Sequence, residues 1–286
     1  MKHITKISYK TKNKMHKIIL VTGSTDGVGK LTALKLAKDG HSVYVHGRSE
    51  AKVYKVIDEI KAASNNENIK GFVADFSDLK TVKQLAEKIK SEISSLDILI
   101  NNAGIFKSPI EKSKDGFDIR MAVNYLAPYV LTENILPVLE KGSNPRIVNL
   151  SSAAQSTVKK EVLIGKTTVN ESEAYAQSKL ALTMWSFNFA KQHPNITTIA
   201  VNPGSLLNTK MAKEAYGQHW SSAEKGVNIL YDLVTAEVYK NDSGKYFDND
   251  KGNAIGHFAS AHPDAYKKDM INDLIRITEK LLEKIN

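Results

Sequence analysis

Hydrophobic residues in the first part of the chain follow two alternating patterns. Short runs of apolar and β-branched residues, of which Ile18–Val21 is the first, are typical of strands buried on both faces. The segments that follow carry apolar residues at helical spacing, as Leu31 and Leu34 do before Gly40 ends the first helix. Strands are predicted at 18–21, 42–47, 69–74 and 96–100, and further helices at 50–64 and 78–92.

The same alternation continues through the second part of the chain. Strands are predicted at 146–150 and 197–201, with helices at 117–139, interrupted at Pro128, and at 175–192. Regular strand–helix alternation with short links implies right-handed crossovers and a parallel sheet covered on both faces. The 286 residues contain no Pro/Gly/Ser-rich linker and no repeat, so these elements are expected to form one domain over residues 15–286.

A glycine-rich turn joins the first strand to the first helix, because residues 22–29 read TGSTDGVG. Glycines let a backbone approach a pyrophosphate closely, and the free N–H groups and dipole of a helix N-terminus attract negative charge. Glycines at this spacing also occur in ordinary turns, but the flanking strand and helix favour a nucleotide-phosphate site. The predicted fold is therefore α/β, a Rossmann-type doubly wound parallel sheet. The residues expected at the phosphate site are Gly23, Ser24, Thr25, Gly27, Val28 and Gly29.

Composition excludes several classes of site. The chain has no cysteine, which excludes disulfides, thiolate nucleophiles and cysteine–zinc sites and fits a reducing, cytoplasmic compartment. The histidines show no ligand spacing with carboxylates, so no metal site is predicted. No apolar run approaches the ~18 residues of a membrane span. The net charge of +9 comes from lysines spread over helix surfaces, which favours a solvated surface over nucleic-acid binding.

The segment before the second methionine, Met15, is basic and polar. It lacks the apolar core of a secretory signal. Residues 1–14 are therefore expected to be a disordered extension, or to reflect an upstream start in place of Met15. Nucleic-acid binding through this segment is a further hypothesis, which a salt-dependent binding assay with and without residues 1–14 would test.

Several further motifs follow the predicted strands in a fixed order. In chain order the motifs are TGxxxGxG at Thr22–Gly29, NNAG at Asn101–Gly104, Asn124 in the long helix, Ser152 after the fifth strand, YxxxK at Tyr175 and Lys179, and PG at Pro203 and Gly204. In this set and order the sequence resembles the short-chain dehydrogenase/reductase family from Lys17 onward. The tail Gly244–Phe247 and the long separation of Ser152 from Tyr175 are most similar to its retinol-dehydrogenase-like branch.

The resemblance implies a catalytic set of Asn124, Ser152, Tyr175 and Lys179. Tyr175 and Lys179 stand at i and i+4 on one helix face, so the ammonium can lie beside the phenol and favour its ionised form. In carbonyl reduction Ser152 and Tyr175 would hydrogen-bond the carbonyl oxygen, and Tyr175 would supply the proton while the nicotinamide delivers hydride. Lys179 would also hold the nicotinamide ribose, and Asn124 would position a water that resupplies protons. Ser151 and Ser152 face opposite ways in a strand, and the family pattern places the catalytic hydroxyl on Ser152.

NADP(H) is the expected cofactor, with NAD(H) as the alternative. Relatives that use NAD resemble one another in an aspartate at the end of the second strand, where this chain has Gly47 followed by Arg48. A guanidinium suits the 2′-phosphate of NADP. Asp26 stands against this preference, because NADP-preferring relatives often carry a basic residue there. The resemblance also implies cofactor contacts from Asp75 (for which a helix cap is the alternative), Phe76, Asn102, Ala103, Gly104, Tyr175, Lys179, Pro203, Gly204, Leu206 and Thr209.

The expected function is hydride transfer between NADP(H) and a carbonyl or alcohol. Residues 205–222, a lid in this family, carry apolar side chains that suit a lipophilic substrate but could also pack the lid against the body. A non-catalytic NADP-binding regulator of the same fold is the alternative, and the complete Ser152–Tyr175–Lys179 set argues against it. The helices at 117–139 and 175–192 are apolar on more than one face, which predicts a homodimer through these helices, as in the family. A monomer whose loop 153–174 covers that face is the alternative.

Overall fold

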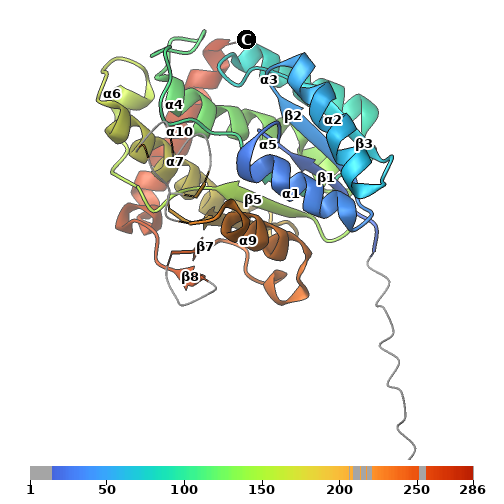
Figure 1. Cartoon of the computed structure of the whole chain (residues 1–286). Coiled ribbons are helices and arrows are strands. Elements are labelled where there is room, and N and C mark those ends of the chain that lie inside the picture. Colours follow the sequence, from blue (N-terminus) through green and yellow to red (C-terminus); the bar gives the residue numbers. More distant parts are fainter. Residues whose placement is uncertain are drawn as a thin grey trace, which may run out of the picture.

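A single eight-stranded sheet forms the centre of the computed structural model, which describes residues 15–205, 207–208, 213, 217, 221–250 and 256–285. The strands lie in the order β3-β2-β1-β4-β5-β6-β7-β8, with helices on both faces (Figure 1). Neighbouring strands pair in parallel except β7 and β8, which are antiparallel. The strands are β1 (Ile18–Val21), β2 (Ser42–Gly47), β3 (Ile69–Val73), β4 (Ile98–Asn101), β5 (Arg146–Leu150), β6 (Thr197–Asn202), β7 (Lys245–Asp248) and β8 (His257–Ala259).

The helices connect successive strands, as the alternating hydrophobic pattern predicts. The α-helices are α1 (Gly27–Lys38), α2 (Glu50–Ser64), α3 (Leu79–Glu92), α4 (Ile119–Met121), α5 (Ala127–Leu139), α6 (Lys160–Leu163), α7 (Glu171–Gln192), α9 (Ala223–Thr235) and α10 (Lys268–Leu282). Shorter helical turns are η1 (Ala122–Leu126), η2 (Glu237–Tyr239), η3 (Pro263–Tyr266) and η4 (Glu283–Ile285). The predicted fold class, a Rossmann-type α/β domain with a central parallel sheet, is confirmed.

Alternating strand residues divide the core into two layers, one on each face of the sheet. On β1, Ile19 and Val21 pack with residues of α1, α2 and α9, whereas Leu20 packs with residues of α3, α5 and α7. β4 repeats this division. Successive side chains of a strand point to opposite faces, so a run that is apolar throughout must be covered on both sides. This requirement explains why these short strands contain almost no polar residues.

The helix predicted at 117–139 is interrupted ahead of Pro128. α4, η1 and α5 follow one another without a gap, and the irregular part is the π-helical turn η1. Pro128 lies in the first turn of α5, where a missing N–H leaves no hydrogen bond unmade. Pro128 therefore does not break the helix, and the irregularity lies in η1, just before it.

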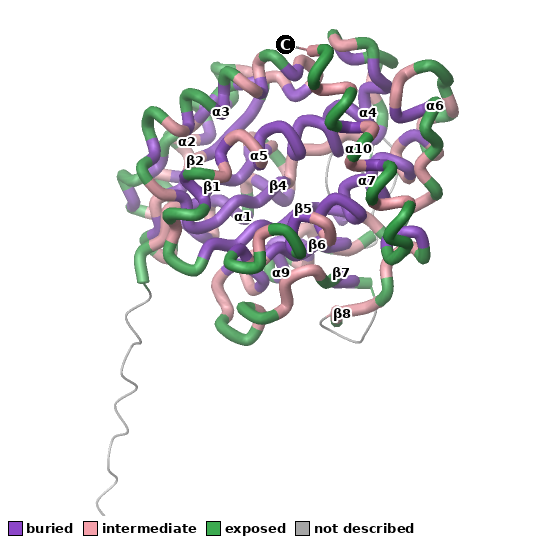
Figure 2. Tube along the Cα trace, turned by 180° about the vertical axis from the view of Figure 1, so that it is seen from behind, coloured by how far each residue is buried: buried purple, intermediate pink, exposed green. Residues whose placement is uncertain are grey.

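The apolar faces of α5 and α7 are covered within the same chain. Residues 177–186 of α7 are all buried, and the tube of Figure 2 is purple along most of α5 and α7. α10 and η3 pack against α7, and the Tyr125 hydroxyl beside α5 hydrogen-bonds the Thr278 hydroxyl of α10 at 2.8 Å. The C-terminal helix therefore covers part of the face that the sequence pattern assigned to a second subunit, and Val158 and Leu163 of loop 153–174 also pack in this layer. Homodimerisation stays a prediction.

Candidate functional site

The glycine-rich turn and the NNAG segment lock together at the carboxyl ends of β1 and β4. Asn102 Nδ2 donates to the carbonyls of Thr22 and Gly23 at 2.8 and 2.9 Å. Thr22 Oγ1 in turn accepts from the N–H groups of Asn102 and Ala103, at 3.0 Å each. A Cβ on Gly29 would stand 2.3 Å from Asn102 Nδ2, and one on Gly23 would stand 2.6 Å from the Ala103 Cα. These glycines therefore serve the close packing of two segments that the sequence presents as separate motifs.

Helix α1 presents its N-terminus directly after this turn. Gly23 and Gly27 have φ values of +62° and +56°, in the left-handed region that favours glycine. The first N–H groups of a helix lack intrahelical partners and bind anions, so the turn has the form of a phosphate cradle. Asp26 caps α1, and its carboxylate accepts from Gly27 N at 2.7 Å. An exposed carboxylate thus stands at the edge of this cradle, at the position where NADP-preferring relatives often carry a basic residue.

A buried histidine supports the same turn from β2. Gly23 N donates to His46 Nδ1 at 3.1 Å, and His46 Nε2 lies 3.2 Å from the Ala74 carbonyl. With Nδ1 accepting, Nε2 must carry the proton, so the imidazole is neutral. Burial lowers the pKa of His46 to about 4, which is consistent with this state. The ring also lies against Phe76, with centroids 4.4 Å apart. The sequence pattern indicated only a strand position for this residue.

The end of β2 leaves no room for an acidic side chain at Gly47. A Cβ there would lie 2.5 Å from the Thr25 methyl group. Arg48, the next residue, is exposed and forms no ion pair with any described residue. Two of the other arginines are buried and bonded to protein: Arg120 to Phe106, Asp118 and Glu171, and Arg146 to carbonyls at the end of α9. Arg48 is thus a cation at the sheet edge that is available to a ligand.

Asp75 and Phe76 follow β3 on the same edge of the sheet. The Asp75 carboxylate accepts from the Ser77 N–H and hydroxyl at 2.9 and 2.8 Å. The cap of α3 is Asp78, which accepts from Lys80 N and Thr81 N. The alternative interpretation of Asp75 as the helix cap is therefore wrong, while its predicted contact with a cofactor stays a prediction.

Asn124 lies in the π-helical turn η1 and holds the loop that follows NNAG. Its Oδ1 accepts from Ile105 N at 2.8 Å, and its Nδ2 donates to the Ile105 carbonyl and to Ser178 Oγ at 3.0 and 2.9 Å. Single π-helical turns inside helices are frequent at functional sites. The amide is thus occupied by protein groups, and the predicted role in positioning a water is not tested by this geometry.

The two serines after β5 have different surroundings. Ser151 is buried and lies against α7, with its hydroxyl 2.6 Å from that of Thr183. Ser152 is half-buried, and its hydroxyl accepts from Ala154 N at 3.1 Å. The Ser151 hydroxyl is therefore committed to the helix, whereas that of Ser152 is the one of the pair that can face a ligand. This arrangement agrees with the choice of Ser152 from the family pattern.

Tyr175 and Lys179 lie one turn apart on α7, beside the end of β5. Lys179 Nζ is 5.6 Å from the Tyr175 ring centroid and donates to the Leu150 carbonyl at 2.7 Å. Burial lowers the pKa of Lys179 to about 8. On its other side Tyr175 meets Phe106, with ring centroids 5.0 Å apart. The ammonium beside the phenol is the arrangement that the i, i+4 spacing predicts.

Pro203 and Gly204 follow β6 and are held by the turn after β7. Asn249 Nδ2 donates to the Pro203 carbonyl at 2.9 Å, and Ser205 N donates to the Asp250 carboxylate at 2.8 Å. Leu206, Thr209 and most of the predicted lid at 205–222 lie outside the described residues, as do residues 1–14. The other candidate residues all follow carboxyl ends of parallel strands or lie on the helices beside them, where α/β proteins bind ligands.

Sequence reasoning missed Arg120, which organises the loop between β4 and α4. Its guanidinium donates to the Phe106 carbonyl at 2.9 Å and to Glu171, at the start of α7, at 2.8 Å. The residue is 3% exposed and also pairs with Asp118. A single arginine just before the Asn124 segment was the available signal, because a lone cation inside an otherwise apolar helix needs buried partners.

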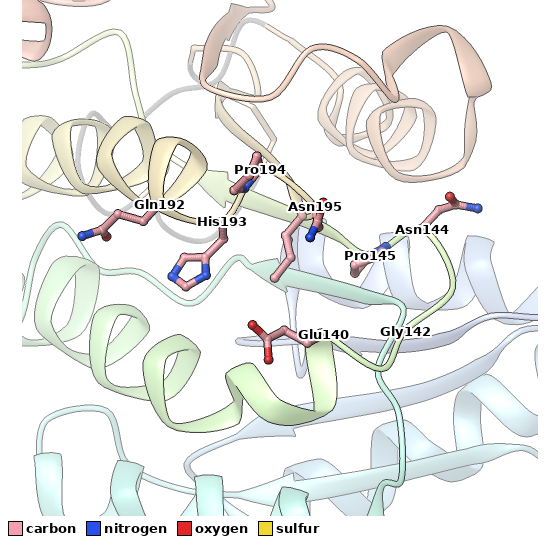
Figure 3. Close-up of a pocket in the computed structure, with 9 residues that line it drawn as sticks. Glu140, Gly142, Asn144, Pro145, Gln192, His193, Pro194 and Asn195 are labelled. Carbon is pink, nitrogen blue, oxygen red and sulfur yellow. The ribbon is translucent and has the colours of Figure 1, made fainter.

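A cavity of about 400 Å³ lies at the opposite edge of the sheet (Figure 3). It is lined by the ends of α5 and α7 and by residues just before β5 and β6, among them Glu140, Pro145, His193 and Asn195. These positions are at the amino ends of the strands. The cavity is therefore separate from the motif residues, and it holds none of the predicted site residues.

Comparison with known proteins agrees with the fold and the order of the motifs. The family model for short chain dehydrogenase matches residues 17–220. Retinol dehydrogenase 12 of Mus musculus is 33% identical over 248 residues, which cover 82% of this chain and 78% of the relative. Polyprenol dehydrogenase of Homo sapiens is 31% identical over 210 residues, covering 70% of this chain and 63% of that relative.

Solved structures give the same result. A short chain dehydrogenase from Escherichia coli CFT073, complexed with NADPH, aligns with a TM-score of 0.69 at 26% identity and covers 83% of this chain and 98% of that one. The fold and its dinucleotide-type turn define a Rossmann α/β protein. The chain belongs to the short-chain dehydrogenase/reductase family of oxidoreductases, in the retinol-dehydrogenase-like branch.

Proposed function

We propose that this protein is an NADP(H)-dependent oxidoreductase that interconverts a lipophilic carbonyl compound and its alcohol. The observation that carries the proposal is the position of Lys179. Its buried ammonium is hydrogen-bonded to the end of β5, two residues before Ser152, and lies 5.6 Å from the Tyr175 ring. A lysine that is 4% exposed is costly to bury, so its presence beside Tyr175 points to a chemical role.

In carbonyl reduction, Tyr175 acts as the proton donor and Ser152 as a second hydrogen-bond donor to the carbonyl oxygen. The positive charge of Lys179 favours the phenolate that remains after the proton has left Tyr175. When bound, the reduced nicotinamide supplies the hydride. Asn124 fixes Ile105, and Arg120 fixes Phe106, so the loop that faces Tyr175 is held from two sides. Such preorganisation keeps the reacting groups in place without rearrangement during the reaction.

NADP(H) is the cofactor that the end of β2 favours. The Thr25 methyl group occupies the space that a side chain at Gly47 would need. Arg48 provides an exposed guanidinium at the adjacent position, and planar guanidinium groups bind phosphate in a bidentate manner. The Escherichia coli relative complexed with NADPH supports the same choice. Asp26 at the α1 N-terminus opposes it, and Arg48 is expected to outweigh this exposed carboxylate because it can contact the phosphate directly.

A lipophilic substrate is favoured by the apolar wall beside Tyr175. The ring of the buried Phe106 lies 5.0 Å from that of Tyr175, so the side of Tyr175 that it covers is aromatic rather than polar. Two relatives are named for retinol and for polyprenol, which are both lipophilic alcohols. A hydrophobic neighbour of the carbonyl contributes about 0.8 kcal/mol for each buried CH₂ group.

A panel of aldehydes and ketones of increasing chain length, assayed by the loss of NADPH absorbance, tests this function. We expect turnover with NADPH to exceed that with NADH, and kcat/KM to rise with the apolar length of the substrate. Absence of any turnover across the panel, or of NADP(H) binding in a direct titration, would contradict the proposal. Equal turnover of short polar carbonyls would contradict the substrate class alone.

A further inference from the structure

The backbone carbonyl of Ser152 receives two hydrogen bonds from side chains outside its own strand. The Tyr246 hydroxyl on β7 donates to this oxygen at 2.9 Å. Gln155 Nε2 donates to the same oxygen at 2.8 Å. Tyr246 is 3% exposed, and burial raises the pKa of its hydroxyl, which therefore remains a donor at all ordinary pH values. The carbonyl is thus held between a residue of the sheet and a residue of the following loop.

The loop that contains Gln155 is itself tied to the C-terminal part of the chain. Gln155 Oε1 accepts from His262 N at 3.2 Å, so the orientation of the amide is fixed while its Nε2 faces Ser152. Two residues further on, the Thr157 hydroxyl donates to the Asp264 carboxylate at 2.6 Å. The segment after β8 therefore holds the side chain of Gln155, which in turn donates to the Ser152 carbonyl.

These contacts matter because Ser152 lies beyond the last residue of β5, where the sheet no longer determines its backbone. Clamping the carbonyl fixes the peptide plane that follows Ser152 and with it the direction of the Cα–Cβ bond. We propose that Tyr246 and Gln155 are positioning residues that hold Ser152 so that its hydroxyl meets the carbonyl oxygen of the substrate. This inference rests on the proposed function. Neither residue bonds to the Ser152 hydroxyl, so both act through the backbone.

The test removes the hydroxyl with Tyr246→Phe, in the full-length protein and with the best carbonyl substrate of the panel. We expect kcat to fall by about fivefold to tenfold, the worth of roughly one hydrogen bond, with the dissociation constant for NADPH unchanged. The same substitution in a Ser152→Ala background should cause no further fall, because the group that Tyr246 positions is gone. A role in folding alone would act equally in both backgrounds.

Tyr231→Phe is the matched control, since it removes a tyrosine hydroxyl on α9 that is bonded to Asp39, the residue that caps the C-terminus of α1. It should leave kcat unchanged. Gln155→Met removes the second donor from a half-buried loop position and should reproduce the kcat effect if Tyr246→Phe fails to fold. Additive losses in the Ser152→Ala background, or an unchanged kcat in both variants, would overturn the inference while leaving the proposed function intact. A wild-type protein without any NADPH turnover would overturn the proposed function first.

Discussion

At the scale of single residues, we propose that cofactor choice depends on two neighbouring positions at the end of β2. Gly47 has no space for a side chain beside Thr25, and Arg48 is a cation without an ion-pair partner among the described residues. Adenosine-ribose recognition through an aspartate at Gly47 would therefore require Thr25 to move. The proposed preference for NADP over NAD thus has two sources, which are the packing of Thr25 against Gly47 and the positive charge of Arg48.

Arg48→Asp should shift preference from NADPH towards NADH, because a 2′-phosphate cannot be bound against a carboxylate. A charge-assisted hydrogen bond is worth about 1.5–3 kcal/mol, so NADPH affinity should fall about tenfold or more. Arg276→Asp, an exposed site on α10 with the same change in net charge, is the control and should leave affinity unchanged. Fluorescence titration with both cofactors measures the effect. Equal discrimination in wild type and Arg48→Asp would refute the assignment.

Lys179 should leave a signature in the pH dependence of stability. Its pKa is about 8 in the fold and 10.5 as the unperturbed value. The unfolded chain therefore binds more protons between these values, so Lys179 contributes stability that rises with pH through this window and is lost as pH falls through about 8. Lys179→Met removes this contribution. Denaturant unfolding measures the unfolding free energy of both proteins at pH 7 and pH 10. Between these pH values the unfolding free energy of wild type should rise, relative to that of the variant, by up to roughly 3 kcal/mol. Parallel pH dependences would contradict the burial of a charged Lys179.

Some contacts of single residues could be predicted from the sequence, and others could not. The Tyr175–Lys179 contact and the proximity of the glycine turn to NNAG were predictable, since one follows from helix spacing and the other from strand order. The choice of Ser152 over Ser151 came from the family pattern, because strand alternation alone says only that the two face opposite ways. The structure adds that Ser151 is the one that meets α7. His46 was not recognised because its partners are backbone groups far away in the chain, and Arg120 was not recognised because it joins the Phe106 carbonyl to the distant side chain of Glu171.

At the scale of elements, the buried strands were predicted to within two residues because unbroken apolar runs leave little choice of conformation. The edge of the sheet was not predicted: β7 was noted only as a family tail, and β8 is three residues long. α10 was also missed, although Met270, Leu274, Ile277 and Leu281 recur at helical spacing in the sequence. The packing of α10 against α7 depends on the path of the chain after β8, and local sequence patterns do not predict that path.

Leu274→Ala tests whether α10 is part of the core. Leu274 is 4% exposed and packs in the layer that contains α5 and α7, so its truncation should cost about 2–4 kcal/mol of unfolding free energy. Leu282→Ala, at a half-buried position on the same helix, should cost clearly less. Urea denaturation followed by circular dichroism gives both values. Equal, small losses would mean that α10 is only loosely attached.

At the scale of the whole molecule, the candidate residues lie together at the carboxyl ends of the parallel strands. The segment after β8 contacts two parts of the molecule: α10 packs against α7, and His262 bonds to Gln155 in the loop after Ser152. No described helix has the length and apolarity needed to cross a bilayer. The cytoplasmic location and the disordered extension at 1–14 stay predictions, and so does the homodimer.

Light scattering on the purified protein tests the homodimer. The prediction made from the apolar helices requires a mass near twice 31.6 kDa at micromolar concentration. A mass near 31.6 kDa would refute it and would mean that the cover supplied by α10 is sufficient.

The central claim is that Tyr175 supplies the proton in an NADPH-dependent reduction, and Tyr175→Phe tests it most directly. The substitution removes the acid and very little binding surface, so steady-state turnover of the best carbonyl substrate should fall at least about a hundredfold. NADPH affinity, measured on the same preparation by fluorescence titration, should stay within about twofold of wild type. A variant that binds NADPH normally and retains a substantial fraction of wild-type turnover would contradict the account.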